Sequence, residues 1–488
     1  MVNIEISLSA SVVFLLVCYY IANCVGAWQR LRHIPGPFWA RWSRIWLIKQ
    51  IYGGVYMDKI QELHAQYGPV VILAPDFLSV SDPGEIKRIS GVRSVWGRGT
   101  PYLGFRSAPG KDSLFSVRDR KANDKLRGML MGGYTGRSVE SVEAMVDEHV
   151  LKLEKLIEDK YIMTPSGYRP VDFGEKAMYM TMDVISCFAF RNCFGCLERD
   201  SDFHTYLKVT QNVARVLASL CVMPLFQAFM SSPSLKWLLP KGGFFDPIIK
   251  IARAAVSERY GPDKKQRSDV LGAWVAAGLT EKEAEVETVG QLAATAMRAT
   301  MLYLLSNPGA YQKLQGEIDH FVRSKAISQT AVLPEGEIKN WLYLEAVVKE
   351  ALRIFPPVAM MPRSAAVTDT LCGLTVPPNT NVDLAVKPAL RSTSIFGQDA
   401  DLFRPERWIE VDVDTFKQRE ETLRFVFGGP SRRECPGKGL ALLQLHKTFF
   451  DLFRCFDFTI PDPVNPWKAV NTRIWNISDM NVRVTRRE

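Results

Sequence analysis

The sequence FVFGGPSRRECPGKGLALLQLH, Phe425–His446, joins a loop rich in glycine, proline and arginine to an apolar segment. Its one cysteine, Cys435, lies just before Leu440–Leu445, whose apolar character is typical of a helix. Backbone N–H groups and the helix dipole favour negative charge at such a junction, so a thiolate is easier to hold there than at an average surface position. The stretch therefore predicts a thiolate ligand for a soft metal ion.

The residues around Cys435 indicate that the metal belongs to a flat cofactor. The loop glycines, Gly437 among them, remove side-chain bulk and let the backbone approach a planar group closely. Arg432 and Arg433 can pair with carboxylates on the rim of that group. We interpret the combination as a heme site with Cys435 as the axial iron ligand. Because an isolated cysteine is more often a buried structural residue, this interpretation depends on other motifs.

Length and composition describe a globular chain with a large core. The 488 residues are 47% hydrophobic and 23% charged, enough to close around a cofactor. The net charge of +9 is spread along the chain, which argues against nucleic acid binding and favours an anionic membrane face or an acidic redox partner. The nine cysteines lack secreted-scaffold spacing, which indicates a reducing compartment. Cys193 and Cys196 form a CxxC without a second pair, and we interpret them as packing residues rather than zinc ligands.

Residues 1–28 are predicted to form a membrane anchor. No charged side chain occurs between Ile6 and Trp28, and this apolar run is long enough for a helix to cross a hydrocarbon core. Basic residues follow the run rather than precede it, which predicts a cytosolic body and argues against a cleaved signal peptide. Residues 29–40 contain the sequence IPGP and predict a stiff hinge, after which residues 41–488 form the heme-binding domain.

The body is predicted to be mainly α-helical with a small β-rich lobe. An amphipathic helix at Asp58–Tyr67 precedes two runs, VVILAP and FLSVSDP, that are typical of strands. The Gly/Pro-rich residues 96–114 predict a loop over a binding cavity. From Ser138 to Pro308 the pattern is overwhelmingly helical, and the apolar residues 203–229 either roof a cavity for an apolar ligand or belong to the core.

A second motif lies in WLYLEAVVKEALRIFPP, Trp341–Pro357. Glu350 and Arg353 are three residues apart and so share one helix face, where their charges can pair. The later sequence FRPERW supplies Arg407 as a third member. A buried Glu–Arg–Arg set is costly unless every charge is satisfied, so we interpret it as fixing the fold rather than performing chemistry.

These motifs, in this order and spacing, resemble the cytochrome P450 family of heme-thiolate monooxygenases across nearly the whole chain. The family's loop has Arg two residues before the cysteine and Gly two after, which Arg433 and Gly437 match. The loop here is one residue longer than the family pattern, so Arg432 is the alternative partner of a heme propionate. The resemblance implies further heme-binding residues at Asn123, Arg127 and Arg363, with Asn123 where the family usually has an aromatic residue or His.

The resemblance implies a membrane-bound enzyme with the P450 fold and heme b held by Cys435. In the family, electrons come from NADPH through NADPH-cytochrome P450 reductase, and one oxygen atom enters a C–H or C=C bond. The hinge, the stretch FGQDADLFRPERW and the chain's ending resemble fungal enzymes of secondary metabolism of the pisatin demethylase-like type. A lipophilic small-molecule substrate and a single-pass location in the endoplasmic reticulum membrane, with the catalytic domain cytosolic, are therefore expected.

The chain departs from the family in its central helix, expected over Thr280–Asn307. The family's acid–threonine turn, A-G-x-D/E-T, is absent between Gln291 and Ala294, a loss of about six residues that is not a whole number of helical turns. Thr295 is then the candidate catalytic hydroxyl. Either the gene model is mis-joined, or the oxygen chemistry is altered. The alternative functions are a heme-thiolate isomerase or dehydratase, or a catalytically impaired heme-binding relative.

Overall fold

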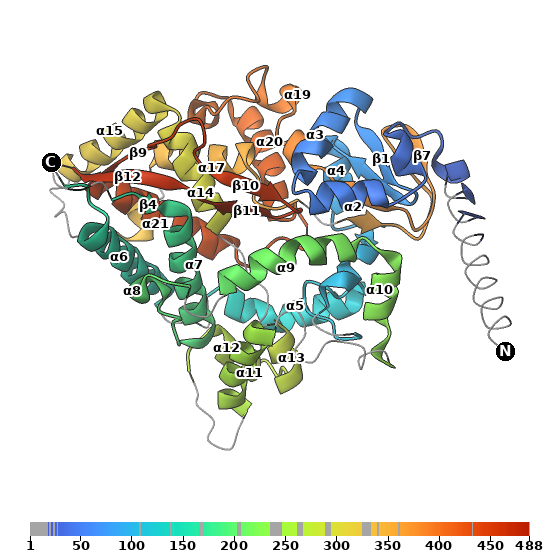
Figure 1. Cartoon of the computed structure of the whole chain (residues 1–488), viewed down its shortest axis with the longest axis horizontal. Coiled ribbons are helices and arrows are strands. Elements are labelled where there is room, and N and C mark those ends of the chain that lie inside the picture. The colour runs from blue at the N-terminus through green and yellow to red at the C-terminus, as the bar shows by residue number, and fades with distance from the viewer. Residues whose placement is uncertain are drawn as a thin grey trace, which may run out of the picture.

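The computed structural model shows a fold of many helices and, in its described part, four small sheets (Figure 1). It describes a few positions before residue 28 and then residues 28–487, apart from short gaps. The gaps are 107–108, 137–138, 140, 165–166, 168, 203–205, 235–245, 261–266, 288–293, 325–332, 339–340, 360–361 and 432. This architecture confirms the predicted class, mainly α with a small β-rich lobe.

The β-rich lobe is built on a five-stranded sheet of order β1-β2-β8-β5-β3. β1 (Val70–Ala74) and β2 (Phe77–Val80) are antiparallel, and β2 pairs in parallel with β8 (Asn381–Leu384). β5 (Arg363–Ser364) joins β8 to β3 (Gly97–Arg98). All residues of β1, β2 and β8 are buried, as expected for strands covered on both faces, and the two strands predicted from VVILAP and FLSVSDP are confirmed.

Short helices surround this sheet, and they include the predicted amphipathic helix. They are η1 (Phe38–Arg41), α2 (Ile45–Tyr52), α3 (Tyr56–Tyr67), α4 (Pro83–Ser90) and α18 (Val386–Ala389). In Figure 1, α2, α3 and α4 lie close to β1 in the upper right of the molecule. Asp82 caps the first turn of α4 by accepting from the N–H of Glu85, and Pro83 begins that helix without losing a hydrogen bond.

The predicted hinge is docked on β1. The N–H of Ile72 donates to the carbonyl of Pro35 at 2.9 Å, and Ile34 is fully buried in the core. Gly36 has a φ of +146°, and a Cβ there would lie 2.7 Å from Ile72 Cγ2, so this close approach requires glycine. The segment therefore has a fixed direction relative to the sheet.

The helical lobe contains the remaining helices and 3-10 turns. They are η2 (Thr100–Phe105), α5 (Arg120–Tyr134), α6 (Val142–Lys160), α7 (Phe173–Phe190), α8 (Cys196–Arg199), α9 (Tyr206–Cys221), α10 (Pro224–Ser231), α11 (Asp246–Tyr260), α12 (Val270–Ala276), α13 (Glu281–Glu287), α14 (Ala294–Leu305), α15 (Pro308–Ser324), α16 (Glu335–Ile338), α17 (Leu342–Ile354), α19 (Thr393–Phe396), η4 (Pro405–Trp408), α20 (Val413–Leu423), η5 (Arg424–Phe427) and α21 (Lys438–Cys455). The smaller sheets are β4 (Val171–Asp172), β12 (Asn481–Arg486) and β9 (Phe456–Thr459), then β10 (Lys468–Asn471) with β11 (Trp475–Ser478), and β6 (Asp369–Leu371) with β7 (Leu374–Val376).

The core of the helical lobe is centred on α21, which follows the cysteine loop. Every residue from Leu443 to Arg454 is buried, and the rings of Phe449, Phe450 and Phe453 are fully so. α21 packs against α6, α15 and α17, so it is surrounded by helices rather than exposed on one side. Polar side chains are buried there as well, among them Gln444, Lys447 and Asp451. The cysteine loop is therefore anchored to a helix that is buried over most of its length.

The helix predicted over Thr280–Asn307 is helical in the described parts on either side of residues 288–293, and its central turn lies outside the described residues. α13 ends at Glu287 and α14 begins at Ala294, with residues 288–293 outside the description. α13 packs beside α11 and α12, whereas α14 packs on α7 and α17, and Figure 1 shows the two helices in different parts of the molecule.

The predicted anchor, residues 1–28, lies mostly outside the described residues, and the domain boundaries stay predictions. In the part of the chain that is described, no single helix has both the length and the apolar character needed to cross a membrane. The helices Val213–Cys221 and Pro224–Ser231, bent by 91°, meet that test only when they are taken together.

The cysteines differ from the sequence interpretation at one place. Cys193 forms a disulfide with Cys187 at the end of α7, while Cys196, its partner in the CxxC, is buried and takes no part in that disulfide. The disulfide forms because α7 ends at Arg191, whose left-handed backbone conformation, with a φ of +51°, turns the chain back toward Cys187. Spacing along the sequence does not reveal this reversal.

Candidate functional site

The cysteine loop is a tight structure between η5 and α21. Gly428 and Gly429 have φ of +93° and +79°, a conformation that favours glycine, and a Cβ on Gly428 would lie 3.0 Å from the carbonyl of Arg433. The N–H of Cys435 donates to the carbonyl of Phe427 at 2.7 Å, which closes the loop. Cys435 therefore lies three residues before the first residue of α21, as the sequence predicts.

The thiol of Cys435 is accessible yet surrounded by protein groups. Burial raises its pKa, whereas the N–H of Gly437 and the positive charges of Arg127 and Lys438 lower it. Gly437 leaves space beside the sulfur, since a Cβ there would lie 3.9 Å from Sγ. Metal ligation removes the thiol proton outright, so these donors and charges suit a bound thiolate.

Two arginines lie directly opposite each other on neighbouring strands. Arg98 in β3 and Arg363 in β5 are register partners, and both are buried. Nη1 of Arg98 donates to the carbonyls of Leu114 and Val117, but Nε of Arg98 and both Nε and Nη1 of Arg363 have no hydrogen-bond partner among the described residues. Like charges opposite each other in a sheet are unfavourable, and unpaired buried N–H groups are costly. An anionic group bound beside these two arginines would offset both costs.

Arg433 and Arg127 add to the same positive region. Burial and the neighbouring charges of Arg363 and Arg98 lower the pKa of Arg433 to about 10. Burial also lowers the pKa of Arg127, whose Nη2 donates to the carbonyl of Glu434 at 2.7 Å, one residue before Cys435. Within the described residues, none of these four arginines forms a salt bridge with a carboxylate side chain.

Asn123 shares a hydrogen-bond acceptor with Arg98. Its Nδ2 donates to the carbonyl of Leu114 at 3.1 Å, the carbonyl that also accepts from Arg98, while its Oδ1 has no partner in the part of the chain that is described. The structure thus brings Asn123, Arg127, Arg363 and Arg433 into one neighbourhood with the cysteine loop. Arg432, the alternative propionate partner, lies outside the described residues.

The candidate catalytic hydroxyl lies at the start of α14. Thr295 is buried and is the second residue after 288–293, which are outside the description. Thr300 is engaged within the helix, since its Oγ1 donates to the carbonyl of Ala296 at 2.9 Å. The role of Thr295 stays a prediction.

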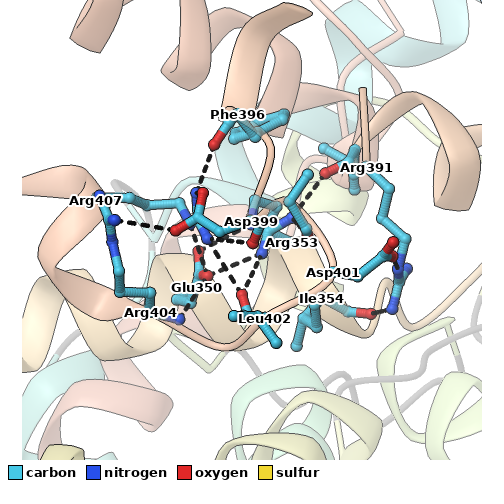
Figure 2. Close-up of polar contacts among 12 residues, drawn as sticks. Glu350, Arg353, Ile354, Arg391, Phe396, Asp399, Asp401, Leu402, Arg404 and Arg407 are labelled. Carbon is cyan, nitrogen blue, oxygen red and sulfur yellow. Dashed lines mark hydrogen bonds and ion pairs between the residues drawn. The ribbon is translucent and has the colours of Figure 1, made fainter. Parts of the chain in front are cut away.

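The Glu–Arg–Arg set is fully buried and fully paired (Figure 2). Glu350 accepts from Nε and Nη2 of Arg353 at 2.8 Å and from Nε of Arg407 at 2.8 Å. The indole N–H of Trp408 and the backbone N–H of Arg404 also donate to Glu350, both at 2.9 Å. The carboxylate therefore receives five hydrogen bonds from α17, η4 and the residue before η4.

The remaining guanidinium donors of this set are bound by loop carbonyls. Arg353 donates to the carbonyls of Leu390, Ala400 and Leu402, and Arg407 donates to those of Phe396, Asp399 and Leu402 and to the Asp399 carboxylate. All five N–H groups of each arginine thus have an acceptor, which meets the condition for burying such charges. These bonds fix the segment between α18 and η4, as the sequence interpretation expects.

Sequence analysis missed Arg98 and a second buried ion pair. Arg473 pairs with Asp383, and Tyr56 donates to the same carboxylate, with all three side chains buried. Arg98 had only a weak signal, a single arginine in the stretch WGRGTPY, residues 96–102. Neither group could be recognised before elements far apart in the sequence were placed together, since Asp383 lies in β8, Tyr56 in α3 and Arg473 between β10 and β11.

The fold and the site together define a heme-thiolate protein: buried unpaired arginines suit two propionates, and a loop cysteine suits the iron. The model of the family described as "Cytochrome P450" matches residues 35–479. The chain therefore belongs to the cytochrome P450 family, whose cofactor is heme with a cysteine thiolate on the iron.

Similar proteins are fungal P450 monooxygenases. The chain is 31% identical to cytochrome P450 monooxygenase ABA1 of Pyricularia oryzae over 98% of this chain and 96% of that protein. It is also 31% identical to cytochrome P450 monooxygenase aba1 of Botryotinia fuckeliana over 94% and 92% of the two chains. A solved structure, the cytochrome P450DA heme domain, superposes with a TM-score of 0.74 at 16% identity, covering 90% of this chain and 95% of that one. This last likeness supports the P450 fold alone.

Proposed function

We propose that this protein is a membrane-bound P450 monooxygenase that oxidises a lipophilic small molecule in fungal secondary metabolism. Cys435 is the axial iron ligand in this proposal, and the electrons come from NADPH-cytochrome P450 reductase. The names of the relatives support monooxygenase activity, and they are fungal proteins. The proposal places the catalytic domain on the cytosolic side of the endoplasmic reticulum.

Unbonded N–H groups of buried arginines near the cysteine loop are the observation that carries the proposal. Within the described part of the chain, Nε of Arg98 and Nε and Nη1 of Arg363 are buried without acceptors, and Arg433 adds a third positive charge. The two propionates of heme offer two negative charges and four acceptor oxygens, which match this demand. Bound heme would supply oxygen activation with electrons from the reductase.

This chain's own residues hold and orient the cofactor in the proposal. The arginines of β3, β5 and the cysteine loop bind the propionate edge, and Gly437 leaves space beside the sulfur. Arg127 places its charge near the thiolate and ties α5 to the loop through the carbonyl of Glu434. Thr295 is our candidate for the hydroxyl that delivers protons to the oxygen, in place of the missing acid–threonine turn.

Exposed apolar side chains after the predicted anchor support membrane attachment. Phe38, Trp39 and Ile45 are 64%, 71% and 72% exposed, which is unusual for large apolar residues gathered so closely in sequence. The ring of Trp28 stacks on that of Trp42, with centroids 5.4 Å apart, and so connects the end of the predicted anchor to the body. Aromatic residues of this kind are common at the membrane interface.

The assignment of Cys435 is tested by the spectrum of the reduced, carbon monoxide-bound protein. The wild type should show the red-shifted Soret band of thiolate-bound heme, and Cys435→Ser should abolish it. Cys372→Ser and Cys455→Ser serve as matched controls and should keep the band. Retention of the thiolate band in Cys435→Ser would show that another residue binds the iron.

The membrane topology is tested separately in sealed microsomes. The proposal expects added protease to digest the body from Pro35 onward without detergent, because that part faces the cytosol. A lumenal marker protein serves as the control for intact vesicles. Full protection of the body would refute the topology, and release of the intact protein by carbonate washing would refute a spanning anchor.

A further inference from the structure

Three side chains with metal-binding atoms meet on the side of α7 that faces α6. They are His149 of α6, Cys187 in the last turn of α7, and Cys193 in the loop that follows. Their ligand atoms lie within 4.8 Å of one another. His149 and Cys187 are 1% and 6% exposed, whereas Cys193 is exposed. The cluster is thus built into the core and open to solvent through one residue.

His149 presents a free lone pair to the sulfurs. Its Nδ1 lies 2.7 Å from the carbonyl of Met145, and because a carbonyl only accepts, Nδ1 carries the proton. Nε2 is then unprotonated, and it lies 3.7 Å from Sγ of Cys187. A backbone carbonyl that fixes the tautomer in this way is the usual outer partner of a metal-binding histidine.

The loop that carries Cys193 is held in place by α7 itself. The N–H of Phe194 donates to Oγ of Ser186 at 2.9 Å. The buried carboxylate of Asp183 accepts from the N–H groups of Cys196 and Leu197 at 2.8 and 2.9 Å. These bonds keep Cys193 beside Cys187 whether or not the two sulfurs are joined, so the cluster does not depend on the disulfide.

We propose that His149, Cys187 and Cys193 bind one zinc ion when the Cys187–Cys193 disulfide is reduced. Tetrahedral zinc with typical bond lengths places a nitrogen and a sulfur ligand about 3.6 Å apart, close to the 3.7 Å between His149 Nε2 and Cys187 Sγ. Water takes the fourth position on the exposed side. The ion joins α6 to the end of α7, at a site distinct from Cys435.

The chemistry balances with a cellular thiol as reductant. Two thiol molecules reduce the disulfide and leave as their own disulfide, which gives Cys187 and Cys193 as thiols. Zinc then binds and displaces the two thiol protons, while the neutral imidazole of His149 binds through Nε2 without proton loss. In the reverse direction, the disulfide of the cellular thiol takes two electrons from the two thiolates and becomes two thiols, which re-forms the Cys187–Cys193 disulfide and releases the ion.

The test is zinc stoichiometry of the full-length holoprotein, measured by elemental analysis after equilibration with zinc and gel filtration. Reduced wild type should retain one zinc per heme, and the disulfide form should retain none. Cys193→Ser, on the exposed loop, should lower zinc affinity more than about tenfold, and His149→Gln should do the same. Cys196→Ser is the matched control and should bind zinc like the wild type.

Thermal unfolding provides a second readout. Zinc should raise the Tm of the reduced wild type and of Cys196→Ser, because a ligand that binds only the folded state stabilises it, and should leave Cys193→Ser unchanged. The proposal is overturned if Cys193→Ser retains zinc like the wild type, if the disulfide form binds as much zinc as the reduced form, or if the reduced wild type binds none.

Discussion

Replacement of Glu350 by Gln should destabilise the protein by about 3–5 kcal/mol, the usual cost of breaking a buried ion pair. An amide has one acceptor oxygen, so it fits best where Oε1 now accepts from Arg353, Arg407 and the Arg404 N–H. Its NH2 group then faces Nε of Arg353 and the indole N–H of Trp408, which lose their acceptor. Two buried donors without acceptors cost about 1–3 kcal/mol each, and the set also loses a negative charge.

The matched control for Glu350→Gln is Glu421→Gln. Glu421 also pairs with a cation, Lys87, at 2.5 Å, but both side chains are about half exposed. Loss of such a surface pair costs about 0–1 kcal/mol. The assay is the urea midpoint of the holoprotein, followed by both the heme spectrum and circular dichroism. Equal midpoint shifts for the two variants would refute the reasoning that burial makes this set costly to break.

Three further predictions follow from other sites. Burial lowers the pKa of His64 to about 4, and the hydrogen bond to the Gly68 carbonyl raises it by a smaller amount. Unfolding therefore binds a proton between about pH 4 and 6.5, and stability is lost as the pH falls through that window. The variant His64→Asn should remove ~2 kcal/mol of the difference in unfolding free energy between pH 7 and pH 5, measured by urea unfolding. Arg98→Gln and Arg363→Gln should each speed heme transfer to apomyoglobin about tenfold or more, and unchanged rates would argue against propionate binding. The chain as it stands should release much of its NADPH-derived reducing power as hydrogen peroxide. The variant Thr295→Ala should raise the peroxide formed per NADPH, and an acid–threonine turn inserted after Gln291 should lower it. Tight coupling of NADPH use to product, unaffected by Thr295→Ala, would favour substrate-assisted or isomerase chemistry.

Local sequence patterns predicted those parts of the fold whose interactions are local. The helix α3 and the strands β1 and β2 follow directly from apolar periodicity. The pairing of Glu350 with Arg353 follows from three-residue spacing on one helix. The position of Cys435 just before a helix follows from the composition of its loop.

Groups brought together by distant strands or by a single backbone reversal could not be predicted. Arg98 lies opposite Arg363 only because β3 and β5 are neighbours in the sheet. Each of these strands has two residues, too few to give a recognisable alternating pattern in the sequence. The partner of Cys193 depends on the φ of Arg191, which no spacing rule reports.

The parallel pairing of β2 with β8 sets a waiting time during synthesis. Phe77 in β2 is opposite Asn381 in β8, so the ribosome must add about 300 residues before the partner exists. At about 5–20 residues per second this takes roughly 15–60 s. Throughout that interval the apolar strand β2 lacks its β8 partner, and an unpaired apolar strand edge of this kind is prone to aggregation. The five-stranded sheet of the β-rich lobe is thus the first sheet to be started and is completed late. Binding of chaperones to the growing chain should be greatest while residues 81–380 are being made.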